Sequence, residues 1–253
     1  MKLSVLKIEK IIDNENIVIY PVLLQTEKGN FLVDCGYQET FNELQVELKS
    51  KGIEVKDLTG VIITHDDYDH LGGLHTLKQL NPALKIYCGI DEKDSVSGKI
   101  KSERLLQAEA SLLSIPDEYK AWALNFINKL KSVQRYEVYT TFEDQECFEK
   151  DILILHTPGH TKGHISLYHI HEKTLIAGDA LVIENRELNI ANPQFTLNLP
   201  LALKSVEKIK NFKPQNIICY HGGIMDKNIN CELDRLLTTY SNKAQQNSNA
   251  MVR

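Results

Sequence analysis

Apolar residues in the first quarter of the chain fall into short runs separated by turn residues. The run over 17–24 is rich in β-branched residues, and the runs over 31–33 and 61–64 are almost wholly apolar. Such runs predict β-strands, and the continuous ones predict strands that are buried on both faces. Between them, residues 40–51 carry apolar side chains at helical spacing and end at a Lys-Gly pair, which predicts an amphipathic helix.

The second half of the chain repeats this order of elements. Its pattern predicts three strands, a helix and a further strand, at 152–155, 165–168, 174–177, 199–211 and 217–220. In each half a buried strand is followed at once by a histidine, His65 in the first and His221 in the second. Two matching halves predict two similar layers placed face to face, with the polar residues meeting at one edge.

Residues 91–131 separate the two halves and have mostly helical spacing, with a break at Ile115-Pro116. We expect a helical insertion, which either completes the layered structure or covers a functional site. The expected organisation is a single domain over residues 1–240, followed by a polar C-terminal tail over residues 241–253.

Composition and charge narrow the class of protein. Hydrophobic residues make up 42% of the chain and charged residues 25%, with a net charge of −5, which is ordinary for a globular protein and unlike the basic surface of a nucleic-acid binder. No apolar stretch approaches the ~20 residues that span a bilayer, and the N-terminus lacks the apolar centre of a signal peptide. We therefore expect a cytoplasmic protein with a small-molecule substrate and with neither nucleic acid nor membrane as a partner. Its oligomeric state does not follow from the sequence.

The densest chemical signal is the segment Thr64-His65-Asp66-Asp67-Tyr68-Asp69-His70, directly after a predicted buried strand. Imidazole and carboxylate groups in this density are suited to zinc, iron or manganese. Three more such residues follow predicted strands in the second half, namely His160, Asp179 and His221. Because strand ends hold loop residues in fixed positions, we predict that all of these side chains converge on one metal site.

With these motifs the chain resembles the metallo-β-lactamase superfamily over roughly residues 15–225. The resemblance implies an α/β fold, a four-layered αββα sandwich with a dinuclear metal centre, usually zinc, at one edge. Carried over residue by residue, it implies that His65 and His160 bind the first metal, that Asp69, His70 and His221 bind the second, and that Asp179 bridges both. Asp34, in Val33-Asp34-Cys35-Gly36, resembles the family's acid that orients a metal ligand.

One position departs from the family motif, because Asp67 stands where the family has a second histidine. We expect Asp67 to bind the first metal and Asp66 to face solvent. An exchange of these two roles, or a mononuclear site, remains open. Two divalent cations, a hydroxide and the carboxylates of Asp67, Asp69 and Asp179 sum to zero charge, whereas histidine at position 67 would give +1. We therefore expect a weaker Lewis acid, and manganese or iron as alternatives to zinc at the first site.

The resemblance implies a metal-dependent hydrolase, in which a hydroxide bridging the two metals attacks the substrate. Asp69 is the predicted catalytic residue, orienting the nucleophile or moving its proton. The predicted substrate is a small ester-type compound, such as a lactone, a thioester or a related carbonyl compound. The alternatives are a phosphodiesterase of the same fold, or a non-hydrolytic metal-binding or oxidative protein if Asp67 disables the first site.

Overall fold

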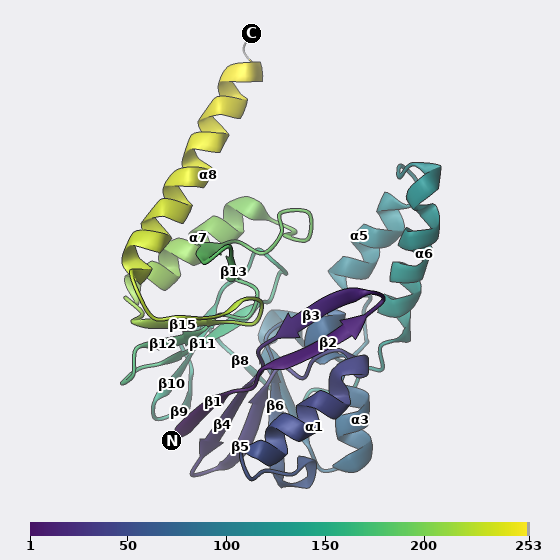
Figure 1. Ribbon diagram of the computed structural model, residues 1–253, viewed down its shortest axis with the longest axis vertical. Helices are drawn as coiled ribbons and strands as arrows, with labels where there is room; N and C mark the ends of the chain where they lie inside the picture. Colours follow the sequence, from purple (N-terminus) through teal and green to yellow (C-terminus); the bar gives the residue numbers. More distant parts are fainter. Residues whose placement is uncertain (252–253) are drawn as a thin grey trace.

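Two six-stranded sheets packed face to face form the centre of the molecule (Figure 1). The computed structural model describes residues 1–251, and the side chains of residues 1–242. The first sheet has the order β1 (Lys2–Val5), β4 (Val22–Thr26), β5 (Gly29–Val33), β6 (Leu58–Ile63), β7 (Lys85–Gly89) and β8 (Thr140–Phe142). The second has the order β16 (Gly223–Met225), β15 (Asn216–Cys219), β12 (Thr174–Ile176), β11 (Ile165–His169), β10 (Ile152–His156) and β9 (Cys147–Glu149).

Two hairpins stand apart from these sheets, β2 (Ile8–Ile12) with β3 (Glu15–Ile19), and β13 (Val182–Glu184) with β14 (Glu187–Asn189). The α-helices are α1 (Phe41–Ser50), α2 (Tyr68–Leu71), α3 (Leu74–Leu80), α4 (Lys93–Val96), α5 (Glu103–Ser111), α6 (Asp117–Ser132), α7 (Leu199–Asn211) and α8 (Ile229–Met251). Short 3₁₀ turns cover Gln38–Thr40, Val55–Asp57 and Ile90–Glu92.

Alternation along the strands divides the apolar side chains among the layers. In β5 and β6, Leu32 and Val61 point to one face of the first sheet and pack with helices α1 and α3. Their neighbours Phe31 and Ile62 point to the other face and pack against the second sheet. Because successive side chains of a strand point to opposite faces, apolar runs without alternation are what a sheet covered on both sides requires.

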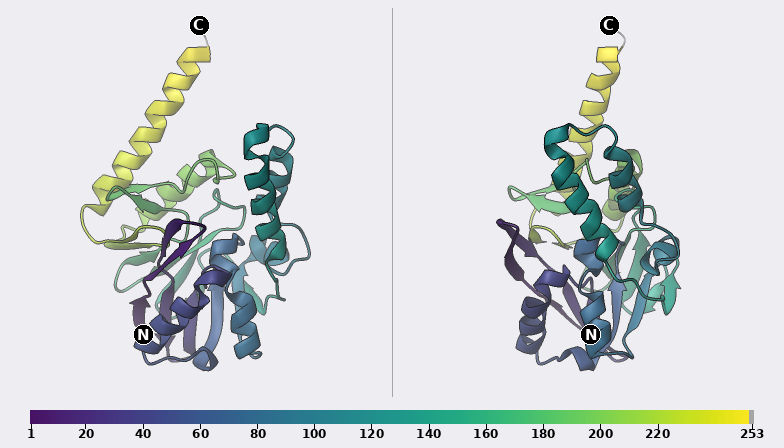
Figure 2. Two further views of the ribbon diagram at one scale, coloured as in Figure 1. Left: turned by 45° about the vertical axis from the view of Figure 1, so that its right-hand side comes forward. Right: turned by 90° about the vertical axis from the view of Figure 1, so that its right-hand side faces the viewer.

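The outer face of the second sheet is covered by α7 and the first half of α8. Helices therefore flank a sheet pair on both sides, and the predicted αββα sandwich is confirmed (Figure 1). The helix α8 continues to Met251 and projects beyond the sandwich (Figure 1; Figure 2). The segment expected as a polar tail is thus part of a helix as far as residue 251, and residues 252 and 253 lie outside the described residues.

A sequence-based boundary needs correction. The run over 17–24 is not one strand, because Pro21 separates β3 from β4, which then pair with different neighbours. Proline lacks the N–H that a ladder needs, so this break has a direct cause. After the segment that carries His65 and Asp67, the chain forms the short helix α2 and then α3, which begins at Leu74.

The helices between the two halves fall where the spacing predicted them. α5 and α6 lie side by side (Figure 1; Figure 2). α5 ends before the predicted break at Ile115-Pro116, and α6 begins directly after it. Among the described residues, no helix combines the length and the apolar character needed to cross a bilayer.

Candidate metal centre

The predicted ligands lie where strands of both sheets end at the same edge of the sandwich. His65 follows β6 in the first sheet, whereas Asp179 and His221 follow the parallel neighbours β12 and β15 in the second. The two edges are joined directly, because the backbone N–H of Ile165 donates to the carbonyl of Thr64 at 3.0 Å. Four segments far apart in the sequence therefore present side chains to one point.

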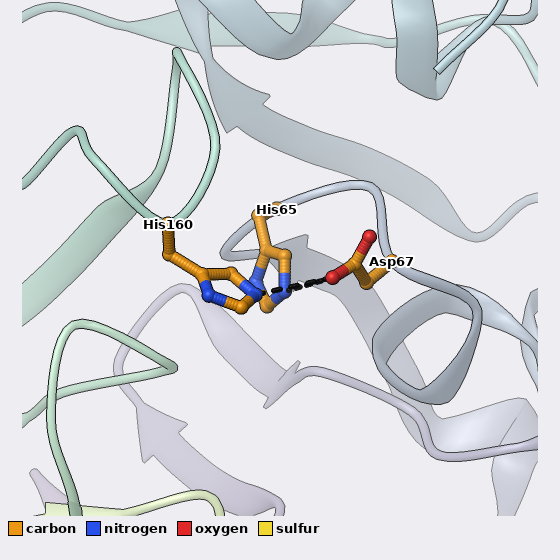
Figure 3. A group of neighbouring side chains, drawn as sticks. All are labelled: His65, Asp67 and His160. Carbon is orange, nitrogen blue, oxygen red and sulfur yellow. Dashed lines mark hydrogen bonds and ion pairs between the residues drawn. The ribbon is translucent and has the colours of Figure 1, made fainter. Parts of the chain in front are cut away.

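The first group of ligand atoms comes from His65, Asp67 and His160 (Figure 3). The Oδ2 atom of Asp67 lies 3.1 Å from Nε2 of His160 and 3.5 Å from Nε2 of His65. All three residues are buried. The carboxylate at position 67 thus occupies the place that the sequence predicted for it.

The second group comes from Asp69, His70 and His221. Oδ2 of Asp69 lies 3.1 Å from Nε2 of His221 and 3.5 Å from Nε2 of His70. Asp179 stands between the two groups, with Oδ1 3.4 Å from Nε2 of His70 and Oδ2 3.6 Å from Nε2 of His160. This is the arrangement in which one carboxylate can contact two ions.

The geometry fits divalent metals. Ligands about 2.0–2.2 Å from a tetrahedral zinc ion are separated from one another by about 3.3 Å, and the distances above lie close to that value. Moreover, Nε2 of His65, Nε2 of His70 and Oδ1 of Asp179 are buried and have no hydrogen-bond partner within the part of the chain that the structure describes. Buried polar atoms are normally satisfied, so these three atoms are suited to bind a metal ion.

Asp34 contacts the second group of ligands through His70 and orients its ring. Its carboxylate accepts hydrogen bonds from the backbone N–H of Thr64 at 2.8 Å and from the Thr64 hydroxyl at 2.8 Å. It also lies 2.9 Å from Nδ1 of His70, so Nδ1 is the donor and Nε2 is left free to face the centre. Asp34 adopts a left-handed backbone conformation with φ of +58°, which is tolerated by aspartate better than by most residues.

His164 positions Asp179 through the backbone. Nε2 of His164 accepts a hydrogen bond from the N–H of Asp179 at 2.9 Å, so Nδ1 carries the proton and donates to the Thr157 hydroxyl, also at 2.9 Å. Thr157 is in turn bonded to Ser166, which donates to the carbonyl of Ala177. Burial, followed by the nearby His65, keeps the pKa of His164 well below its ordinary value, which is consistent with a neutral ring. The close approach of the His164 ring to the backbone requires glycine at position 178, because a Cβ there would lie 2.6 Å from Nε2 of His164.

The two groups of ligand atoms differ in how their surroundings shift the pKa of the histidines. Burial disfavours the charged forms of His65 and Asp67 alike, and it lowers the pKa of His65. For Asp67, burial alone would raise the pKa, but the nearby imidazoles of His160 and His65 and the charge of Arg104 outweigh burial and hold the pKa well below the usual range. For His70, burial opposes protonation, but the charges of Asp69, Asp179 and Asp34 raise its pKa well above the ordinary value.

This difference predicts a pH dependence of metal binding at the second group. The carboxylates favour the protonated form of His70, so a metal must displace a proton there, and the proton competes more strongly as the pH falls. We expect the affinity for zinc to rise from pH 6 through pH 8, and proton release at pH 7.5, visible by calorimetry in buffers of different ionisation enthalpy. An affinity that is constant over this range, with no proton released, would contradict the assignment.

Asp66 is buried, whereas the sequence predicted that it would face solvent. It is 3% exposed, and its carboxylate pairs with Arg135, whose Nη1 lies 3.3 Å from Oδ2. Burial raises the pKa of Asp66 to about 6, although Arg135 opposes the shift. A buried charge needs a partner, and Arg135, which follows α6, supplies one far along the sequence.

Two residues near the centre escaped the sequence analysis. Arg104 of α5 is 3% exposed and pairs with Asp67, with Nη2 2.9 Å from Oδ2. Glu92 is buried and accepts hydrogen bonds from the Thr161 hydroxyl and from the N–H of Gly163, so it holds the loop that carries His160. No motif marks either residue, because an arginine or glutamate in a helical pattern normally faces solvent.

A cavity of about 680 Å³ opens above the ligand atoms. Its base is formed by the proposed ligands, and its walls come from the β2–β3 hairpin, α6, β13 and the loop before α7. Apolar side chains line much of these walls, including Ile12, Ile17, Trp122, Phe126, Ile183 and Phe195. The turn of the hairpin is joined to α6 by the ion pair between Asp13 and Lys129.

Comparisons with known proteins agree with this geometry. The model of the metallo-β-lactamase superfamily matches residues 17–221. A probable metallo-hydrolase of Bacillus subtilis, YflN, is 24% identical over 238 residues, which cover 88% of this chain and 87% of the relative. An N-acyl homoserine lactonase of a Bacillus species is 29% identical over 220 residues, covering 76% of this chain and 75% of the relative. The crystal structure of a metallo-β-lactamase family protein from Thermus thermophilus aligns with a TM-score of 0.68 at 20% identity, covering 96% of this chain and 81% of the other.

The chain therefore belongs to the metallo-β-lactamase superfamily and is a metallo-hydrolase. Members of the superfamily bind divalent metals, typically zinc, and the groups of ligand atoms described above are the candidates for that role here.

Proposed function

We propose that this protein hydrolyses a small ester-type substrate, a lactone, a thioester or a related carbonyl compound, at a centre of two divalent metals. His65, Asp67 and His160 would hold the first metal, Asp69, His70 and His221 the second, and Asp179 would contact both. The metals, when bound, would supply a water-derived nucleophile and polarise the carbonyl oxygen.

The protein's own side chains would orient the reaction. Asp69 lies at the base of the cavity, and its Oδ2 lies 3.1 Å from Nε2 of His221. Its backbone carbonyl accepts a hydrogen bond from the hydroxyl of Tyr220 at 2.6 Å, so its backbone is held in place. Asp69 can therefore hold the proton of an attacking water at Oδ1 or Oδ2, as the sequence analysis proposed.

The charge of the cavity walls is the observation that carries the choice of substrate. Six carboxylates are among the described lining residues, namely Asp13, Glu15, Asp67, Asp69, Asp179 and Glu184. The lining lysine and arginine, Lys129 and Arg104, are each already paired with a carboxylate. The metals would offset Asp67, Asp69 and Asp179, so the walls around them carry Asp13, Glu15 and Glu184 against Lys129. These net negative walls disfavour an anionic phosphodiester, whereas an uncharged lactone or ester carries no such penalty.

The apolar walls suit a hydrophobic group attached to the carbonyl. Trp122 and Phe126 stack on α6 with ring centroids 5.6 Å apart, and the ring of Phe195 lies next to Phe126, with centroids 6.4 Å apart. Each methylene removed from water contributes about 0.8 kcal/mol, which corresponds to roughly a fourfold gain in kcat/KM per methylene. One relative is an N-acyl homoserine lactonase, which acts on a carbonyl compound of this kind.

The test is a panel of substrates assayed with protein loaded with zinc, manganese or iron. Acyl homoserine lactones and acyl thioesters of four to ten acyl carbons are compared with bis-p-nitrophenyl phosphate. We expect metal-dependent turnover of at least one carbonyl class, with kcat/KM rising with chain length, and a weaker rise in Trp122→Ala. Turnover of the diester with none of any carbonyl substrate would reverse the choice.

A further inference from the structure

A buried arginine contacts the carboxylate that replaces the family's histidine. Nε of Arg104 lies 3.1 Å from Oδ1 and 3.2 Å from Oδ2 of Asp67, and Nη2 lies 2.9 Å from Oδ2. The planar guanidinium thus grips both carboxylate oxygens, the geometry in which arginine binds carboxylates most strongly. The side chain of Arg104 is 3% exposed, so this contact is shielded from water.

The guanidinium is fixed by further hydrogen bonds on its remaining sides. Nη1 donates to Oε1 of Gln107 at 2.8 Å, and Nη2 donates to the backbone carbonyl of Phe195. Gln107 in turn donates to the carbonyl of Gln194 at 3.3 Å. Arg104 is therefore held between α5 and the loop before α7, and it is not free to swing toward a ligand in the cavity.

The guanidinium of Arg104 lies beside the first group of ligand atoms. Nη2 of Arg104 is 3.4 Å from Nε2 of His160, while Oδ2 of Asp67 is 3.1 Å from the same nitrogen. Figure 3 shows the rings of His65 and His160 turned toward the Asp67 carboxylate. Arg104 therefore contacts the same Oδ2 atom of Asp67 that would bind a metal together with His65 and His160.

This position changes the charge of the centre. The sum made from the sequence, with Asp67, Asp69, Asp179, a hydroxide and two divalent cations, was zero. Arg104 adds one positive charge beside Asp67, so the pair of side chains is neutral, as a histidine at position 67 would be. The expectation of a weaker Lewis acid therefore needs this partner to be taken into account and stays a prediction.

We infer that Arg104 is a positioning residue for the first metal site, and that Asp67 and Arg104 together take the place of one neutral histidine. Arg104 fixes the carboxylate so that Oδ2 faces His65 and His160, and it offsets the carboxylate's charge. The inference rests on the proposed metal centre. It also implies that replacing either residue alone lowers the metal affinity of the first site.

The test is a double-mutant cycle on bound metal. In Asp67→His the guanidinium loses its partner and stands beside three imidazoles, so we expect the affinity of the first site for zinc to fall about 10- to 100-fold. In the double variant Asp67→His with Arg104→Met the cation is gone and the affinity recovers toward that of the unmodified protein. Zinc per chain is measured by mass spectrometry at buffered free zinc, and the first site is the one that His160→Ala abolishes.

A second readout is the melting temperature of the metal-free protein. Arg104→Met leaves Asp67 without its partner, so we expect this variant to melt several degrees lower than the unmodified protein without metal. It should also gain less from added zinc, because its first site binds the metal more weakly. Arg135→Met is the matched control, since Arg135 pairs with Asp66 and does not line the cavity. It should leave the zinc affinity of the first site unchanged.

The outcomes separate the two proposals. If the unmodified protein binds no divalent metal, the proposed function fails and the inference fails with it. If the unmodified protein binds zinc at the first site, and Asp67→His binds it as tightly as the double variant does, the metal centre stands and the role of Arg104 is overturned. Occupancy of the second site in each variant shows that the fold is intact.

Discussion

Asp179→Ala is expected to bind no more than one metal per chain and to lose about a thousandfold or more in kcat/KM on any substrate that the unmodified protein turns over. Asp179 offers Oδ1 to the side of His70 and His221, at 3.4 and 3.7 Å, and Oδ2 to the side of His160, at 3.6 Å. Metal ions stabilise transition-state charge by several kcal/mol, and each 1.4 kcal/mol is a factor of ten in rate.

Metal per chain and steady-state kinetics check this prediction together. Asp226→Asn is the control, because Asp226 is exposed and lies outside the cavity lining, and it should behave as the unmodified protein does. Two tightly held metals in Asp179→Ala would show that this carboxylate does not join the two groups.

Asp34→Ala is expected to destabilise the protein by about 3–5 kcal/mol, the cost of removing one partner of a buried charged pair. The substitution leaves the N–H and hydroxyl of Thr64 and Nδ1 of His70 without their acceptor. It also places alanine in a left-handed conformation that aspartate tolerates better. For a domain of this size the melting temperature should fall by roughly 6–20 °C.

Asp34→Asn separates the two roles of this residue. Asparagine keeps the backbone conformation and one acceptor oxygen, so the melting temperature should fall less than in Asp34→Ala. The affinity for zinc at His70 should still fall about 10- to 100-fold, as is usual when a group that orients a metal ligand is lost. Unchanged melting and zinc affinity in both variants would remove Asp34 from the centre.

The sequence was most informative where local pattern and tertiary role coincide. The helix predicted over 199–211 has those bounds in the structure, since an asparagine cap and a proline at its start are local signals. The proposed ligands could be named because they follow buried strands, and parallel strands end at a common edge. The structure brings all seven together, and their binding of metal stays a prediction.

The parts that could not be predicted depend on contacts between distant segments. The strands of the β13–β14 hairpin have only three residues each and include polar residues, so their pattern alone is weak. Arg104 and Asp66 have buried, charged side chains only because Asp67 and Arg135 reach them from elsewhere in the chain. Nothing in the local sequence distinguishes such a residue from one that faces water.

The helix α5 carries the cation that accompanies Asp67, although it belongs to the segment that separates the two halves of the fold. This segment therefore cannot be exchanged between relatives independently of the ligand loop. If it were transplanted into a relative with histidine at the corresponding place, it would bring an uncompensated positive charge to the metals. A chimaera that receives this chain's segment and keeps its own ligand loop should therefore fail, whereas one that exchanges both together has the matching pair.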